Sequence, residues 1–153
     1  MQQRTVLLSD AAATRGLGRD LARQWLSLPD QGRPALLLRG DLGAGKTCLV
    51  QGVAEGLGIS EPITSPTFAL AQHYRGSSGA LVHLDLYRLQ HSAAADDLFA
   101  QEEEAALEQT ALLAVEWPDR LSFVPEHCWQ LQLDWLDPQQ PEAGRRALWL
   151  AMD

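Results

Sequence analysis

Several residue types are scarce in this 153-residue chain, and each scarcity narrows the possible functions. Lysine occurs once, at Lys46, and the two cysteines are Cys48 and Cys128. Two cysteines cannot form the disulfide framework of a small secreted domain, so we expect a cytoplasmic protein. No apolar run approaches the roughly 20 residues that span a bilayer, and residues 1–10 lack the apolar stretch of a signal peptide. We therefore expect no membrane partner.

Basic charge is scarce as well. The formal net charge is −8, and hydrophobic residues make up 46% of the chain. A protein that grips nucleic acid by itself normally presents a basic surface, so any contact with nucleic acid should be indirect. The length and the hydrophobic share predict one folded domain over residues 1–153.

Apolar periodicity and turn residues predict the order of the secondary-structure elements. We expect a helix after Ser9 or Asp10 and further helices over residues 46–57 and 93–110. Strands are expected over residues 5–8, 35–38, 67–74, 80–87, 112–115, 129–136 and 146–152. Because helices interleave with strands, the chain should have an α/β layered fold.

Residues 40–47, GDLGAGKT, match the P-loop pattern G-x-x-x-x-G-K-[ST] at every fixed position. Glycines let such a loop approach an anion closely, and the helix that follows adds free N–H groups and its dipole. We expect Lys46 to reach the β- and γ-phosphates of a nucleotide and the Thr47 hydroxyl to bind Mg²⁺. The predicted nucleotide contacts are Gly40, Asp41, Leu42, Gly43, Ala44, Gly45, Lys46 and Thr47.

Two apolar runs end in a carboxylate. Asp85 closes LVHLD and Glu116 closes LLAVE. In an α/β sheet the carboxyl ends of the strands form the edge where ligands bind, and a P-loop site needs an acid there for Mg²⁺. One acid could hold the metal or its water, and the other could orient or deprotonate the attacking water. Either could instead be a surface acid or pair with Arg88.

The segment SPTF at residues 65–68 lies between the predicted P-loop helix and the next strand. In P-loop switch proteins a hydroxyl from this region senses the γ-phosphate or Mg²⁺, which would be the role of Thr67. The alternative is that Thr67 merely begins a strand, as β-branched residues often do.

Four motifs occur in one order: GDLGAGKT, SPT at 65–67, HLDLYR at 83–88 and VEWP at 115–118. Together they resemble the bacterial TsaE family, the ATPase of tRNA threonylcarbamoyladenosine biosynthesis, over roughly residues 10–125. The resemblance implies a P-loop NTPase-like fold with a mixed central sheet flanked by helices. It also implies ATP or ADP as ligand with Mg²⁺, slow ATP hydrolysis, and two partner proteins that transfer threonylcarbamoyl to an adenosine of tRNA.

The resemblance further assigns roles to individual residues. It makes Lys46 the phosphate lysine and gives the metal to Thr47 and Glu116, directly or through water. The catalytic set it implies is Lys46, Thr67, Asp85 and Glu116. Thr14 would lie near the adenine and Cys48 would offer its amide to the α-phosphate, whereas Trp117 and Arg88 lie near the site without an assigned role.

Two regions depart from the family pattern. Residues 93–108 are rich in alanine and acid, so residues 102–104 could form either a solvated helix face or a partner surface. The tail from Pro138 matches poorly, and we assign no role to it. The four histidines and Cys128 do not have a metal-ligand spacing.

Two other functions stay open at this point. A small-molecule kinase usually carries an arginine-bearing lid, for which Arg75 and Arg88 are the nearest candidates. A non-catalytic, nucleotide-gated assembly subunit would use the same phosphate loop. A GTPase is disfavoured, because the N-K-x-D element that reads guanine needs an asparagine, and this chain has none.

Overall fold

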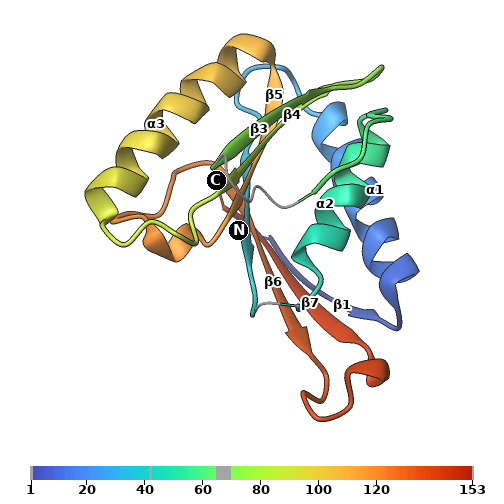
Figure 1. Cartoon of the computed structure of the whole chain (residues 1–153). Coiled ribbons are helices and arrows are strands. Elements are labelled where there is room, and N and C mark those ends of the chain that lie inside the picture. The colour runs from blue at the N-terminus through green and yellow to red at the C-terminus, as the bar shows by residue number, and fades with distance from the viewer. Residues whose placement is uncertain (1, 42, 65–69, 153) are drawn as a thin grey trace.

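The structure is a computed structural model that describes residues 2–41, 43–64 and 70–152. It is a seven-stranded mixed sheet with helices on both faces, which confirms the α/β class (Figure 1). The strands are β1 (Gln2–Leu8), β2 (Ala35–Arg39), β3 (Ala71–Arg75), β4 (Ala80–Asp85), β5 (Ala111–Glu116), β6 (Cys128–Trp135) and β7 (Arg145–Met152). The helices are α1 (Ala11–Ser27), α2 (Lys46–Gly56) and α3 (Ser92–Gln109), with short 3-10 turns η1 (Pro118–Arg120) and η2 (Pro141–Ala143).

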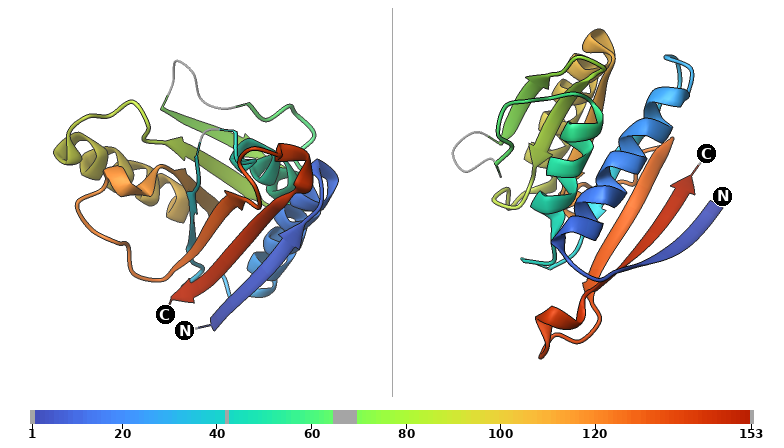
Figure 2. Two further views of the ribbon diagram at one scale, coloured as in Figure 1. Left: turned by 90° about the horizontal axis from the view of Figure 1, so that it is seen from below. Right: turned by 90° about the vertical axis from the view of Figure 1, so that its right-hand side faces the viewer.

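The strand order is β1-β7-β6-β2-β5-β4-β3. The central strands β6, β2, β5 and β4 run parallel, whereas β3, β7 and β1 pair antiparallel with their neighbours. The first and last strands are paired, so the two chain ends lie side by side (Figure 2). The parallel centre brings the carboxyl ends of four strands to one edge of the sheet.

Helices α1 and α2 cover one face of the sheet and α3 covers the other (Figure 1). Helix α1 begins where the side chain of Asp10 accepts a hydrogen bond from the Ala13 N–H at 2.8 Å, as an N-cap does. Helix α2 lies very close to it. A Cβ added to Gly52 would lie 2.0 Å from the Arg15 carbonyl oxygen, so only glycine fits there. This contact fixes the P-loop helix against α1.

Strand alternation separates two hydrophobic cores. Leu81 of β4 and Leu112 of β5 belong to the core under α1 and α2, whereas Val82 and Leu113 belong to the core under α3. Because side chains two residues apart on a strand share a face, three polar residues of β4 and β5 are also directed to the α2 side of the sheet. They are His83, Asp85 and Glu116.

Several predicted boundaries need correction, and strand β1 begins at Gln2 rather than at residue 5. Strand β4 ends at Asp85 rather than at residue 87, because the Asp85 carboxylate accepts a hydrogen bond from the Tyr87 N–H at 2.9 Å and turns the chain. Strand β3 begins at Ala71, and the part of the predicted strand over residues 67–69 lies outside the described residues.

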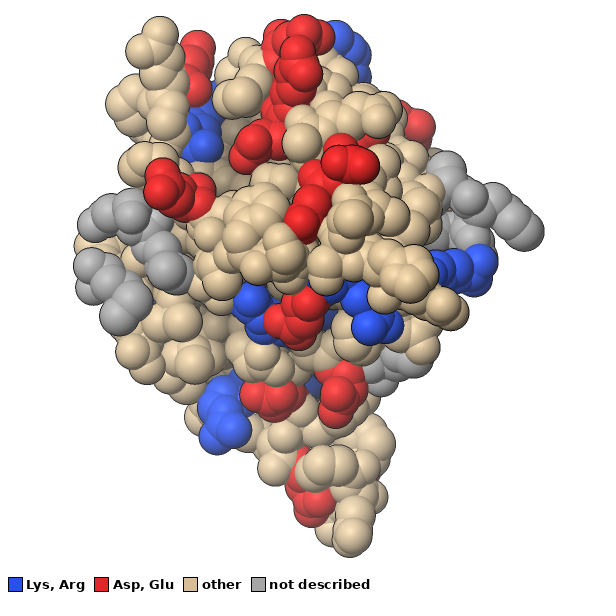
Figure 3. All heavy atoms as spheres, turned by 90° about the vertical axis from the view of Figure 1, so that its left-hand side faces the viewer, with Lys and Arg blue, Asp and Glu red and all other residues tan. Residues whose placement is uncertain are grey.

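The acidic helix α3 also differs from expectation at one position. A solvated face predicts exposure of residues 102–104, and Glu103 and Glu104 are indeed exposed. Glu102 is only 7% exposed, because it points to β3 and its Oε2 lies 2.7 Å from His73 Nε2. Figure 3 shows this side of the molecule, where acidic side chains are spread over the whole face with basic ones between them.

None of the helices that the structure describes combines the length and apolar character needed to cross a bilayer.

Candidate functional site

The P-loop joins β2 to α2 at the carboxyl edge of the parallel strands. Gly40, Gly43 and Gly45 have φ of 147°, 83° and 105°, a region that side-chain-bearing residues avoid. A Cβ on Gly40 would also lie 2.6 Å from the Leu133 carbonyl oxygen. The glycines of the motif are therefore required by the backbone itself. Leu42, the remaining predicted contact of this loop, lies outside the described residues.

Lys46 is held in the centre of the site. It is 5% exposed, and its Nζ donates a hydrogen bond of 2.7 Å to the Gly40 carbonyl. The same ammonium lies 4.0 Å from the centroid of the Trp117 ring, a cation–π contact. Burial lowers the pKa of Lys46, and nearby carboxylates, first Glu116 and then Asp85, oppose that shift. The lysine is thus a desolvated cation surrounded by acids.

A small cavity of about 140 Å³ opens beside this lysine. Its lining combines the loop with the end of β2 and the turn after β5: Leu38, Arg39, Gly40, Asp41, Lys46, Trp117, Asp119 and Gln132. Arg39 Nε donates to Asp119 Oδ1 at 3.0 Å on its rim. The cavity is therefore lined by charges of both signs.

The two strand-end acids are brought together as neighbours. Strands β4 and β5 are parallel, and Asp85 pairs in register with Glu116. Glu116 is 3% exposed. Burial raises the pKa of Asp85 and the charge of Glu116 adds to the rise, whereas the Tyr87 N–H, His83 and Lys46 oppose it. Lys46, Asp85 and Glu116 thus form one electrostatic cluster, as the strand-end argument predicts.

Glu116 contacts a buried histidine, His83, and the sequence motifs assign no role to this histidine. His83 is completely buried, and its Nε2 lies 2.5 Å from Glu116 Oε2. The other ring nitrogen of His83, Nδ1, has no hydrogen-bond partner among the described residues. The HLDLYR motif contains this histidine, but its contact with Glu116 depends on the β4–β5 register.

An aromatic group borders the site after β5. Trp117 has φ of 59°, and its ring lies 4.8 Å from that of Tyr87, centroid to centroid. Arg120 Nη2 donates to the Tyr87 carbonyl at 3.1 Å and so ties the two segments together. Trp117 therefore forms a wall of the Lys46 cavity, whereas Arg88 is exposed.

The remaining predicted contacts lie at the junction of α1 and α2. Thr47 and Cys48 are in the first turn of α2, and Cys48 Sγ donates to the Ala11 carbonyl at 3.2 Å. Thr14 is fully buried, and its hydroxyl donates to the Asp10 carbonyl at 3.3 Å. The start of α1 thus adjoins the P-loop helix. Thr67 lies outside the described residues.

Trp135 at the end of β6 and Arg145 at the start of β7 adjoin the P-loop, and no motif in the sequence points to them. A Cβ on Gly45 would lie 3.1 Å from Arg145 Nε, and the Arg145 guanidinium lies 4.6 Å from the centroid of the Trp135 ring. Arg145 Nε is buried without a partner among the described residues. The pairing of β6 with β7, in which Trp135 faces Arg145, brings this cation to the loop.

The oxygen donors of the site fit a magnesium ion shared with a phosphate. Among the described residues no group of three or more His, Cys, Asp or Glu could hold a metal by itself. Mg²⁺ is usually bound through one or two carboxylates together with substrate phosphates, and it prefers oxygen. A hydroxyl at Thr47 and the carboxylates of Asp85 and Glu116 supply that donor type.

Comparison with known proteins decides the family. The family model "Threonylcarbamoyl adenosine biosynthesis protein TsaE" matches residues 8–146. The chain belongs to the TsaE family. It is 44% identical to the TsaE of Synechocystis sp. over 122 aligned residues, and the match covers 77% of this chain and 72% of that protein. The TsaE of Nostoc sp. is 38% identical over 124 residues, 81% of this chain and 74% of the relative.

A solved structure with the same fold agrees with the sequence comparisons. The crystal structure of Bacillus subtilis YdiB superimposes with a TM-score of 0.71 at 25% sequence identity, over 99% of this chain and 87% of that one. The fold that the TsaE resemblance implies, a mixed central sheet flanked by helices, is thus confirmed.

Proposed function

We propose that this TsaE-family chain binds ATP with Mg²⁺ at the P-loop and hydrolyses it slowly, in the service of tRNA threonylcarbamoyladenosine biosynthesis. One observation carries the proposal: a glycine loop with positive φ holds Lys46 beside two neighbouring strand-end carboxylates. The names of its relatives supply the pathway.

The phosphate end of the nucleotide is assigned to the loop. The N-terminal end of α2 carries the positive end of the helix dipole, and the N–H groups of such a loop and helix start commonly bind phosphate oxygens, here those of the β- and γ-phosphates. Lys46 is desolvated, which strengthens its attraction to a phosphate. In our proposal it leaves the Gly40 carbonyl and the Trp117 ring when the triphosphate enters.

The metal and the attacking water are assigned to the strand ends. Thr47 and Glu116 would hold Mg²⁺, which when bound neutralises charge on the β- and γ-phosphates. Asp85 would orient the attacking water and accept its proton, because its raised pKa makes it a stronger base than an exposed aspartate. Thr67 completes the proposed catalytic set.

The partners are assigned on charge. A chain with net charge −8 is poorly suited to hold tRNA alone, so two partner proteins of the threonylcarbamoyl-transfer complex would make that contact. Glu103 and Glu104 of α3 are exposed, and we assign this side of the molecule, where acidic side chains lie among basic ones (Figure 3), to such a partner. The proposed setting is the cytoplasm.

Nucleotide binding is tested by thermal unfolding with ATP–Mg²⁺, with GTP–Mg²⁺ and without ligand. A ligand at about 100 times its dissociation constant adds about 2.7 kcal/mol to the stability of the folded state. We expect ATP or ADP with Mg²⁺ to raise the unfolding temperature. An unchanged unfolding temperature at millimolar ATP would remove the proposal.

Hydrolysis and partner dependence are tested by ATP turnover with and without the two partners of the modification complex. We expect slow turnover alone that Glu116→Ala abolishes. If Glu116→Ala still supports tRNA modification at the wild-type rate, the chain is a nucleotide-gated assembly subunit instead of an ATPase.

A further inference from the structure

We propose that His83 is a positioning residue that holds the Glu116 carboxylate in the orientation needed to bind Mg²⁺. The inference rests on the proposed function, because it assumes that Glu116 is a metal ligand. His83 itself touches neither the metal nor the nucleotide in this proposal.

The position of His83 in the sheet makes the contact rigid. Strand β4 is an interior strand, paired with β3 on one side and β5 on the other. His83 pairs in register with Ala114, two residues before Glu116, so both side chains extend to the α2 side of the sheet. His83 is fully buried, and the Nε2–Oε2 separation of 2.5 Å is a short hydrogen bond.

The hydrogen-bond inventory fixes the direction of this bond. An ionised carboxylate only accepts, so the shared proton belongs to His83 Nε2. Nδ1 has no partner among the described residues, and as a bare lone pair it is less costly to bury than an unpaired N–H would be. A proton on Nε2 therefore fits the hydrogen bond to Glu116.

The consequence falls on Glu116. Its Oε2 is tied to the imidazole, which leaves Oε1 and the remaining lone pairs free to face a metal. Without this bond the carboxylate can turn toward the Lys46 ammonium, on which Glu116 acts more strongly than Asp85, Asp41 or Asp119 does. Residues that hold a metal ligand in place commonly change metal affinity about 10- to 100-fold when they are removed.

The molecule contains a second histidine–glutamate pair that serves as a matched control. His73 of β3 and Glu102 of α3 lie 2.7 Å apart, on the α3 side of the sheet, away from the P-loop. Removing His73 breaks a similar hydrogen bond without touching the proposed site.

The test measures the affinity of the full chain for a fluorescent ADP analogue, with excess chelator and across a MgCl₂ titration. The variants are His83→Leu, His83→Gln and His73→Leu, and thermal unfolding checks that each is folded. We expect His83→Leu to weaken the apparent Mg²⁺ affinity about 10- to 100-fold, with Mg²⁺-free nucleotide affinity unchanged. His83→Gln, whose amide nitrogen can take the place of Nε2, should restore most of it, and His73→Leu should resemble the wild type.

The possible outcomes separate the two proposals. A wild-type Mg²⁺ response in His83→Leu, or an equal loss of nucleotide affinity with and without Mg²⁺, would overturn the positioning role. A wild-type chain that binds no nucleotide would instead remove the proposed function, and the inference with it. Should His83→Leu fail to fold, His83→Asn gives the same comparison, because its amide is too short to reach Glu116.

Discussion

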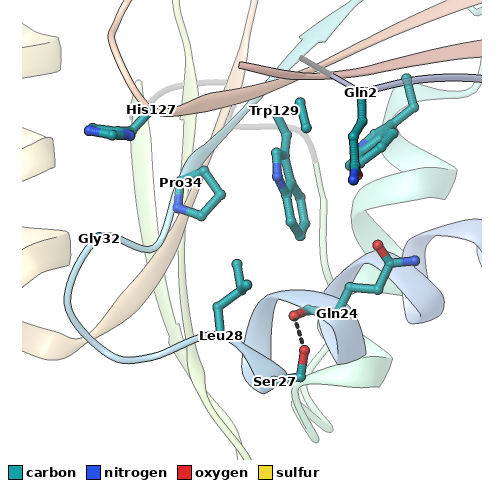
Figure 4. A pocket seen from close by; sticks show the side chains of 10 residues that line it. Gln2, Gln24, Ser27, Leu28, Gly32, Pro34, His127 and Trp129 are labelled. Atoms are coloured by element: carbon teal, nitrogen blue, oxygen red, sulfur yellow. Dashed lines mark hydrogen bonds between the residues drawn. The ribbon is translucent and has the colours of Figure 1, made fainter. Parts of the chain in front are cut away.

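Two cavities lie at opposite ends of β2, and the larger one has the less reactive lining. The larger cavity holds about 590 Å³ and lies before β2 begins, between the end of α1 and the strands β1, β7 and β6 (Figure 4). Its lining is Gln2, Gln24, Ser27, Leu28, Gly32, Pro34, His127, Trp129, Trp149 and Ala151. The smaller, about 140 Å³, lies where β2 ends, beside Lys46.

The two cavities differ in the charge of their lining residues and in the backbone geometry beside them, and these differences matter more here than their volumes. Among the described residues no Asp, Glu, Lys or Arg lines the larger cavity, and two of its lining residues, Trp129 and Trp149, pack edge to face with each other. The smaller cavity has a desolvated ammonium, two acids at its rim and a loop in which Gly40, Gly43 and Gly45 have positive φ. A search guided by size alone would choose the end of β2 that lies away from the P-loop.

The strongest test of this contrast removes one polar group from each cavity. Lys46→Ala should weaken ATP–Mg²⁺ binding by about 100-fold, or about 2.7 kcal/mol, because charge-assisted hydrogen bonds to the phosphates are lost. Gln24→Ala, in the larger cavity, should leave affinity unchanged. Calorimetric titration of both folded variants measures the difference, and equal affinities would show that Lys46 does not contact the nucleotide.

The same contrast predicts a difference in stability between two glycines. Gly40→Ala should destabilise the fold by about 2 kcal/mol, because Gly40 has φ of 147° and its new Cβ would lie 2.6 Å from the Leu133 carbonyl oxygen. Gly32, in the loop by the larger cavity, has φ of 81° with open space around it, so Gly32→Ala should cost only about 1 kcal/mol. Urea unfolding measures both, and a cost at Gly32 as large as that at Gly40 would contradict the close approach.

Much of the smaller site can be predicted from the sequence, because its residues either form one contiguous segment or directly follow an apolar strand. The P-loop is one contiguous segment, so its glycines and its lysine can be recognised as a motif in the sequence alone. Asp85 and Glu116 can be placed at one edge of the sheet from the residue pattern, since each follows an apolar strand. The α/β class follows for a similar reason, from the local alternation of helices and strands.

The sequence does not predict contacts that depend on strand order and register. Arg145 lies a hundred residues after Gly45, and it reaches the loop because β7 folds back antiparallel on β6. His83 meets Glu116 because β4 and β5 align Asp85 with Glu116. Glu102, expected in solvent, is buried because α3 packs with that side toward β3. Such pairings are set by tertiary packing and leave no short-range pattern in the sequence.

Arg145, which belongs to none of the sequence motifs, gives a further test of the assignment of nucleotide binding to the P-loop end of β2. Its guanidinium adjoins Gly45, so Arg145→Ala should weaken ATP binding about 10-fold, or about 1.4 kcal/mol. Arg146, the next residue on β7, is exposed, and its replacement by alanine should have no effect. Both proteins lose one positive charge, so a comparable drop in both would point to net charge instead of contact with the loop.

The smallest expected effect concerns the pH dependence of stability. Burial and the charge of Glu116 raise the pKa of Asp85, so its ionised form is disfavoured in the folded state relative to the unfolded state. At a pH below the unfolded pKa, Asp85 is protonated in both states and costs nothing. As pH rises from the unfolded pKa to the raised folded pKa, the unfolded state releases its proton more readily than the folded state, and stability falls.

Asp85→Asn should therefore be slightly more stable than the wild type at neutral pH, and the gain should vanish in acid. Thermal unfolding of both proteins from acid to neutral pH measures the gap, and a gap of constant size would mean that the ionisation of Asp85 is not its source.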